Sequence, residues 1–200
     1  MNYTNWVATE KEIEEAVTRL FGEYPPYPFH NLFHTISVVI HSKEMTDHYL
    51  LSAEESFIVV AAAWFHDTGQ LNGPEKDHEE RSVEYMLQHL SRSVPGLTNK
   101  IRKCILATKM NVKPTTLLEA ILCDADTYHV GTDLFRETNT LVMKEIEQRQ
   151  GSPATDWPRK SLDFLMRHVF HTDYCRKLLD QGKVRNMRWL MTQIEGQNTE

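Results

Sequence analysis

The residue types in this chain that could do chemistry are histidine and aspartate, and they occur in three short groups. An adjacent pair, His66 and Asp67, ends the apolar run FIVVAAAWFHD. His30 and His34 lie upstream in HNLFH, and Asp126 closes the downstream segment LCDAD. Imidazole nitrogens combined with carboxylate oxygens are typical ligands of divalent transition metals. The three groups therefore predict a metal site that is assembled from distant parts of the chain.

The positions of these residues in predicted helices support a metal site. His30 and His34 are four residues apart, so on a helix they share one face, and either could bind metal while the other serves the chemistry. Asp126 ends an apolar segment, where an unpaired carboxylate would be costly to bury unless a cation or a donor meets it. The ligand types favour manganese, iron, cobalt, nickel or zinc, with magnesium as a further option.

The elements that must position these residues are helices, because apolar side chains recur at helical spacing and no strand pattern is convincing. Ser52 with Glu55, and Asp77 with Glu80, are spaced as N-terminal helix caps. Helices are predicted at about residues 9–21, 30–50, 52–67, 77–90, 98–109, 115–126, 133–150, 160–168 and 173–195. The break at 151–158 is short, so we predict a single all-α domain over 1–200, with 151–200 as C-terminal helices packed on the same core.

Composition and charge narrow the class of protein. The content of 40% hydrophobic and 25% charged residues is ordinary for a soluble globular protein, and a net charge of -6 argues against general nucleic-acid binding. The longest apolar run, 57–65, is far shorter than the roughly 20 residues of a membrane-spanning helix. The acidic, polar N-terminus is unlike a secretory signal, and the three cysteines form no CxxC pair. We therefore expect a cytoplasmic protein without membrane or nucleic-acid partners.

The motifs HNxxH and HD, followed by a late Asp, resemble those of the HD-domain superfamily of metal-dependent phosphohydrolases. The resemblance covers at least 27–126, and YPFHNLFHT is similar to the YHNxxH element of HD proteins related to cyclic-nucleotide phosphodiesterases. It implies a helical bundle with a metal site between core helices. It also implies that His30 is the general acid that protonates the leaving oxygen, since an imidazole exchanges protons near neutral pH. The ligands that it implies are His34, His66, Asp67 and Asp126.

A second metal is suggested by the segment HEERS, which is similar to the part of dinuclear HD proteins that supplies a further ligand. On this resemblance His78 would bind a second ion, bridged to the first by Asp67. The chain departs from the dinuclear pattern near the end of the following helix, where it has ATKM and no histidine. Lys109 in that segment could instead place an ammonium near a phosphate and serve catalysis. We therefore expect one firm metal site and leave the second open.

The function that the resemblance implies is hydrolysis of a phosphomonoester or phosphodiester, in a nucleotide or a similar small molecule. Asp67 or Asp126 would also be catalytic, by orienting the nucleophile through a carboxylate oxygen that the metal does not use; of the two, Asp67 is the predicted catalytic residue. Two alternatives stay open: a catalytically weak sensor that binds nucleotide or metal, and an HD-type di-iron oxygenase, which would need a fuller second site. Motifs of P-loop, dinucleotide-binding, serine-hydrolase and HExxH enzymes are absent from the sequence. The exact substrate and the oligomeric state are left open.

Overall fold

All the regular secondary structure in the described part of the chain is helical. The computed structural model describes the backbone of residues 3–197 and the side chains of residues 6–196. Residues 3–197 form nine α-helices and two short 3-10 helices and contain no strand, which confirms the predicted all-α class. Contacts divide the chain into two compact units, one with residues up to 26 and 30–126, the other with 27–29 and residues from 127 onward. A single domain over 1–200, with 151–200 on the same core, stays a prediction.

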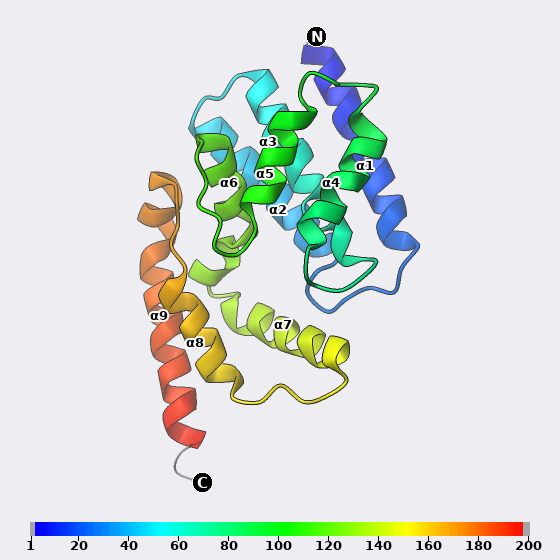
Figure 1. Cartoon of the computed structure of the whole chain (residues 1–200). Coiled ribbons are helices and arrows are strands. Elements are labelled where there is room, and N and C mark those ends of the chain that lie inside the picture. The colour runs from blue at the N-terminus through cyan, green and yellow to red at the C-terminus, as the bar shows by residue number, and fades with distance from the viewer. Residues whose placement is uncertain (1–2, 198–200) are drawn as a thin grey trace. The chain divides into compact units, whose positions relative to one another are not determined.

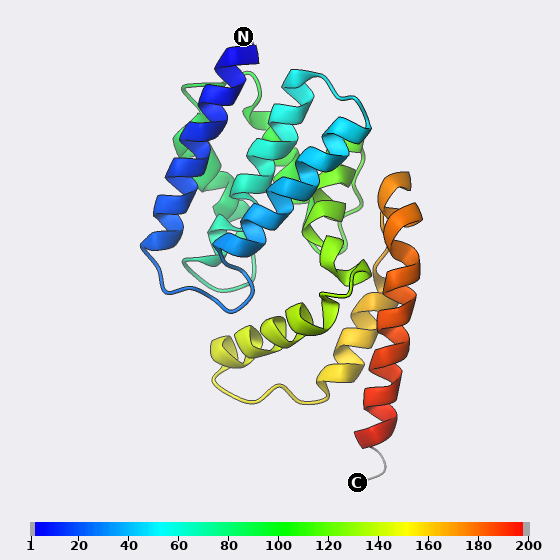
Figure 2. The ribbon, with the colours of Figure 1, turned by 180° about the vertical axis from the view of Figure 1, so that it is seen from behind.

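The first unit is built around helix α3, Ala53–Phe65. Its residues 57–65 are all buried, as expected for a helix that is apolar on every side. The neighbours of α3 are α1 (Tyr3–Gly22), α2 (Leu32–His48), α4 (His78–Leu90), α5 (Thr98–Ala107) and α6 (Leu117–Asp126) (Figure 1). Seen from behind, α1, α3 and α2 lie next to one another (Figure 2). The most apolar segment of the sequence is thus the central helix of this unit.

The predicted N-terminal cap is confirmed for α3, whereas the cap predicted for α4 does not form its hydrogen bonds. The capping box forms as predicted: the Glu55 N–H donates to Ser52 Oγ at 3.3 Å, and the Ser52 N–H donates to Glu55 Oε2 at 3.0 Å. Asp77 does precede α4, but its backbone is left-handed, with φ 59°, and its side chain makes no capping hydrogen bond. Glu80 is instead ion-paired with Lys109 on the surface.

The second unit contains α7 (Phe135–Gln150), α8 (Trp157–Arg167), α9 (Asp173–Gln197) and the short 3-10 helix η2 (Tyr128–Gly131). Helix α9 packs along α8 and against η2 (Figure 1). Glu145 on α7 accepts the Phe29 N–H at 3.0 Å and an Arg149 hydrogen bond at 2.8 Å, which ties residues 27–29 to this unit. None of the helices in 3–197, including the long α9, is long and apolar enough to cross a membrane.

Candidate metal centre

The candidate site lies where the ends of three helices of the first unit meet. His34 is in the first turn of α2, His66 and Asp67 directly follow α3, and Asp126 is the last residue of α6. Helices α2, α3 and α6 all pack against one another. Among the described residues that could bind a metal, these four form a group whose ligand atoms all lie within 4.8 Å of one another. The packing of three helices thus brings together residues that are far apart in sequence.

The distances inside this His-Asp cluster fit a single ion. His34 Nε2 lies 3.1 Å from Asp126 Oδ1, 3.3 Å from His66 Nε2 and 3.4 Å from Asp67 Oδ2. His66 Nε2 lies 3.3 Å from Asp67 Oδ2 and 3.6 Å from Asp126 Oδ1. Two ligand atoms at about 2.1 Å from one ion lie about 3.0–3.4 Å apart at octahedral or tetrahedral angles. The spacing of the donor atoms is therefore close to that of a formed coordination shell.

A main-chain carbonyl orients the His66 ring, and a helix cap fixes the main chain at His34. His66 Nδ1 lies 2.7 Å from the Ala63 carbonyl oxygen, so the Nδ1–H donates there and leaves the Nε2 lone pair facing the cluster. Asn31 is the N-cap of α2, and its side-chain oxygen accepts the N–H groups of Phe33 at 2.9 Å and His34 at 3.2 Å. This cap holds the first turn of α2, and with it His34, in place.

The electrostatics of the cluster fit a divalent cation. Burial lowers the pKa of His34 and His66, but hydrogen bonds to Asp126 and Asp67 and their charges outweigh it, so both imidazole pKa values are raised. Burial raises the pKa of the two carboxyls, but the imidazoles outweigh it and hold both well below the ordinary range. The two carboxylates thus favour positive charge at the cluster, and in the absence of an ion they favour protons on the two imidazoles. A divalent cation that replaces the two protons would balance the same charge, so this donor set fits such an ion.

Comparison with known proteins agrees with this geometry. A family model of the HD domain matches residues 31–131, about half of the chain. The chain belongs to the HD domain family. No curated protein that was compared with it matches. HD domains bind divalent metals and are commonly hydrolases, and the cluster of His34, His66, Asp67 and Asp126 lies wholly within the matched residues.

His30 lies beside the His-Asp cluster of the HD domain, one residue before the matched range. Its Nε2 is 3.9 Å from Asp67 Oδ2, and its side chain is 24% exposed, against 7% for His34. The prediction that His30 and His34 share a helix face is wrong, because α2 begins only at Leu32, after the Asn31 cap. The His30 ring instead meets the His34 ring edge-on, with centroids 5.8 Å apart. It therefore stands at the cluster's more accessible side.

His78, the first residue of α4, lies on the other side of Asp67. Its Nε2 is 3.3 Å from Asp67 Oδ1, and its Nδ1–H donates to the Glu75 carbonyl oxygen at 2.9 Å. Burial lowers the pKa of His78, but its contact with Asp67 outweighs burial and raises it. Asp67 thus faces His78 with Oδ1 and the ligands His34 and His66 with Oδ2. This is the arrangement that the predicted bridging role requires.

The other predicted or conspicuous residues are engaged elsewhere. The ammonium of Lys109 is ion-paired with Glu80 rather than with a cluster residue, so its catalytic role stays a prediction. Three further histidines bond to groups outside the cluster: His41 to Glu44, His89 to the Tyr85 carbonyl, and His168 to the Thr127 hydroxyl. That these histidines are not metal ligands stays a prediction.

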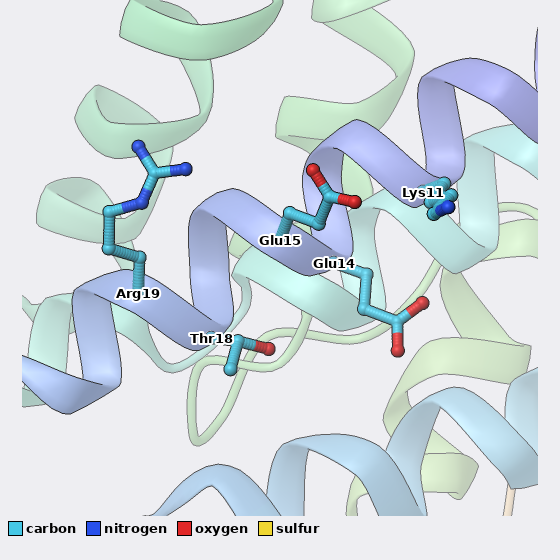
Figure 3. A pocket seen from close by; sticks show the side chains of 5 residues that line it. All are labelled: Lys11, Glu14, Glu15, Thr18 and Arg19. Carbon is cyan, nitrogen blue, oxygen red and sulfur yellow. The ribbon is translucent and has the colours of Figure 1, made fainter.

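A surface hollow on α1 is a weaker candidate site than the cluster. Its lining side chains come from one helix and carry both charges: Lys11, Glu14, Glu15, Thr18 and Arg19 (Figure 3). It contains no histidine and none of the residues that the HD domain brings together. It therefore offers no chemistry that the cluster lacks.

Three residues that support the metal centre were missed by reasoning from sequence. Asn31 could have been found, because an asparagine before an apolar helix is a strong N-cap signal. Gly69, in the turn-rich loop after the HD pair, packs against the start of α4. The role of Arg81 could not be predicted from the sequence, because its hydrogen-bond partners are main-chain carbonyls of a loop.

Proposed function

We propose that this HD protein is a metal-dependent phosphohydrolase that cleaves a phosphomonoester or phosphodiester in a nucleotide or a similar small molecule. One observation carries the proposal: the ligand atoms of the His-Asp cluster converge, with the His30 imidazole beside them. His66 is fully buried, whereas the side chains of Asp126 and His30 are 25% and 24% exposed. A substrate would therefore approach from the side of Asp126 and His30.

The residues that would hold the ion are His34, His66, Asp67 and Asp126, with His78 at the second oxygen of Asp67. Manganese, iron, cobalt, nickel and zinc suit this mixture of nitrogen and oxygen ligands, with magnesium as a further option. When bound, such an ion supplies positive charge to a phosphate oxygen and lowers the pKa of water toward neutrality. The ion would also provide the positive charge that an acidic protein otherwise lacks for a phosphorylated substrate.

Two side chains would move the protons of the reaction. Asp126 contacts His34 and His66 through Oδ1, so Oδ2 is the carboxylate oxygen that would accept a proton from the attacking water. As the water oxygen bonds to phosphorus and the ester P–O bond breaks, the Nε2–H of His30 would protonate the departing oxygen. Asp67 contacts His66 through Oδ2 and His78 through Oδ1, so it would hold the two sides of the site together, and its role in orienting the nucleophile stays a prediction.

The wider setting of the activity follows from composition. A small phosphorylated substrate, without a nucleic-acid or membrane partner, is consistent with the net charge of -6. The sequence also favours a cytoplasmic location. A catalytically weak sensor of nucleotide or metal is the alternative that the same cluster would serve.

The test is hydrolysis of an aryl phosphate, a bis-aryl phosphate and a panel of nucleotides by metal-stripped protein. Manganese, iron, cobalt, nickel, zinc and magnesium are added back one at a time, with the double variant His66→Ala/Asp67→Ala as control. We expect turnover that depends on metal and is lost in the double variant, and the preferred ester separates phosphatase from phosphodiesterase. Tight metal binding without turnover on any ester would reject the hydrolase and favour the sensor.

A further inference from the structure

The loop between the HD pair and α4 is held by one arginine side chain. Arg81, in the first turn of α4, donates from Nε to the Gly69 carbonyl at 3.0 Å and from Nη1 to those of Lys76 and Asp77 at 3.0 and 3.2 Å. Its Nη2 donates to the Pro74 carbonyl. One guanidinium therefore binds four main-chain carbonyls that span the loop from its first residues to its last.

The loop needs such support, because much of it has no regular backbone pairing. After the short 3-10 helix η1 (Thr68–Gln70), the chain runs without a helix to His78. Two of its residues have positive φ: Gly73 at 114° and Asp77 at 59°. Carbonyls that lack partners within secondary structure need donors from elsewhere, and the planar guanidinium supplies several at once.

The same loop sets the place of His78. Its Nδ1–H donates to the Glu75 carbonyl, which lies between the Pro74 and Lys76 carbonyls that bind Arg81. The other end of the loop packs tightly on α4: the Gly69 N–H donates to Ser82 Oγ at 2.8 Å. The acceptor that orients the His78 ring is thus flanked on both sides by carbonyls that Arg81 holds.

We propose that Arg81 is a positioning residue for the second half of the metal centre, which holds His78 against Oδ1 of Asp67. Among the described residues, the guanidinium bonds to the loop carbonyls and to no ligand of the cluster. His34 lies on α2, Asp126 lies on α6, and His66 directly follows α3, and these three helices pack against one another. Loss of Arg81 should therefore weaken the ion at the His78 side and spare the ion at the His34 side. This inference rests on the proposed function, because it assumes that ions bind at Asp67.

The test is calorimetric titration of metal-stripped protein with manganese, which measures binding rather than turnover. Wild type should bind two ions of unequal affinity. Arg81→Gln should weaken the second ion by about 10- to 100-fold, the usual effect of removing a group that orients a ligand. His78→Gln should do the same, and the double variant should be no weaker than His78→Gln alone. Arg102→Gln, which removes an exposed arginine from the neighbouring helix α5, is the matched control and should bind as wild type.

Other outcomes would overturn the inference. These are a second ion bound equally well by wild type and Arg81→Gln, a single ion unaffected by His78→Gln, or equal weakening of both ions by Arg81→Gln. If Arg81→Gln does not fold, Arg81→Lys takes its place, since one ammonium cannot reach all four carbonyls, and the same weakening of the second ion is expected. Two-ion binding with the expected pattern but no hydrolysis would reject the proposed function and leave the inference standing.

Discussion

The two oxygens of Asp67 face two regions that are built in different ways. On the Oδ2 side, His34 and His66 are carried by helices whose apolar faces pack together. On the Oδ1 side, His78 follows a loop that is held mainly by hydrogen bonds from Arg81. Packed helices place ligands through many small contacts, whereas a loop held by one side chain loses its geometry in a single substitution. We call the Oδ2 side, with His34, His66 and Asp126, the helical half of the site, and the Oδ1 side, with His78 and its loop, the loop half. We expect metal binding at the helical half to tolerate single substitutions and metal binding at the loop half to be weakened by them.

The largest effect should follow from Asp67→Asn, because Asp67 is the residue that both halves share. An amide keeps the shape but removes the charge that offsets the divalent ion and the neighbouring imidazoles. We expect both ions to be lost from a calorimetric titration and hydrolysis to fall by about 1000-fold or more, since the ion supplies several kcal/mol.

The comparison variant for Asp67→Asn is His78→Gln, which removes a ligand from the loop half and leaves the ligands of the helical half unchanged. It should keep the tight ion and most of the turnover that this ion supports. If Asp67→Asn kept both ions, or if His78→Gln abolished the tight one, the division of the site at Asp67 would be wrong.

The next effect concerns His30, which lies on the helical side of Asp67 but is not one of the four clustered ligands. His30→Gln should slow cleavage of alkyl phosphates by about 100- to 10,000-fold, the range for loss of a general acid. Aryl phosphates with an acidic leaving group need no protonation, so their cleavage should fall much less. Metal affinity should be unchanged.

The diagnostic measurement for His30 is the ratio of the two rates in wild type and variant. An equal fractional loss on both esters would show that His30 does not protonate the leaving group. A drop in metal affinity would place it among the ligands instead.

The helical half was the more predictable from sequence. The ligands His34, His66 and Asp126 sit at the ends of amphipathic or apolar helices, and helical periodicity together with the HD motif is enough to bring them together. The prediction failed locally at His30, because the pattern does not show where a cap such as Asn31 starts the helix.

In the loop half, only His78 could be predicted from the sequence, through the resemblance of its segment to dinuclear HD proteins. Its geometry depends on Arg81 bonding to carbonyls, and every residue has a carbonyl, so no side-chain pattern marks the partners. The tight approach of Gly69 to α4 is equally invisible, since a glycine in a turn-rich segment predicts only a bend. The boundary between the two compact units near residue 127 has no signal in the sequence, where the one break in the helical pattern that suggests a boundary is the short one at 151–158.

Alanine substitutions at two closely packed glycines can distinguish an effect on metal binding at the loop half from a general loss of stability. A Cβ at Gly69 would lie 2.7 Å from the Ser82 amide nitrogen and closer still to the His78 carbonyl oxygen. A Cβ at Gly131, in the second unit, would lie 2.5 Å from Leu179 Cβ. Each alanine substitution should lower the free energy of unfolding by about 1–3 kcal/mol, the usual cost of overpacking, as measured in urea.

The two glycine variants should differ in metal binding. Gly69→Ala should also weaken the ion that depends on His78, because the loop must move away from α4 to admit the methyl group. Gly131→Ala, the matched control, should bind both ions as wild type does. Equal metal affinity in the two variants would mean that the contact of the loop with α4 does not place His78.

The smallest effect is the pH dependence of the helical half, which should change sign when metal is bound. In metal-free protein the pKa values of His34 and His66 are raised above 6.5. Their stabilisation is therefore fully present below pH 6.5 and is lost as the pH rises through the raised values. The carboxyl pKa values are lowered below 3.8, so their contribution is constant across this window and is lost only in strong acid.

Metal binding reverses this trend because an ion needs the neutral imidazoles and must displace their protons. Its affinity should rise with pH by up to about tenfold per unit for each proton released, until the raised pKa values are passed. Thermal melts from pH 6 upward should thus show a falling Tm for metal-stripped protein and a growing increment on adding manganese. Parallel curves for the two forms would mean that the imidazoles at Oδ2 of Asp67 do not exchange protons for the ion. The raised pKa values of His34 and His66 would then not govern metal binding at the helical half.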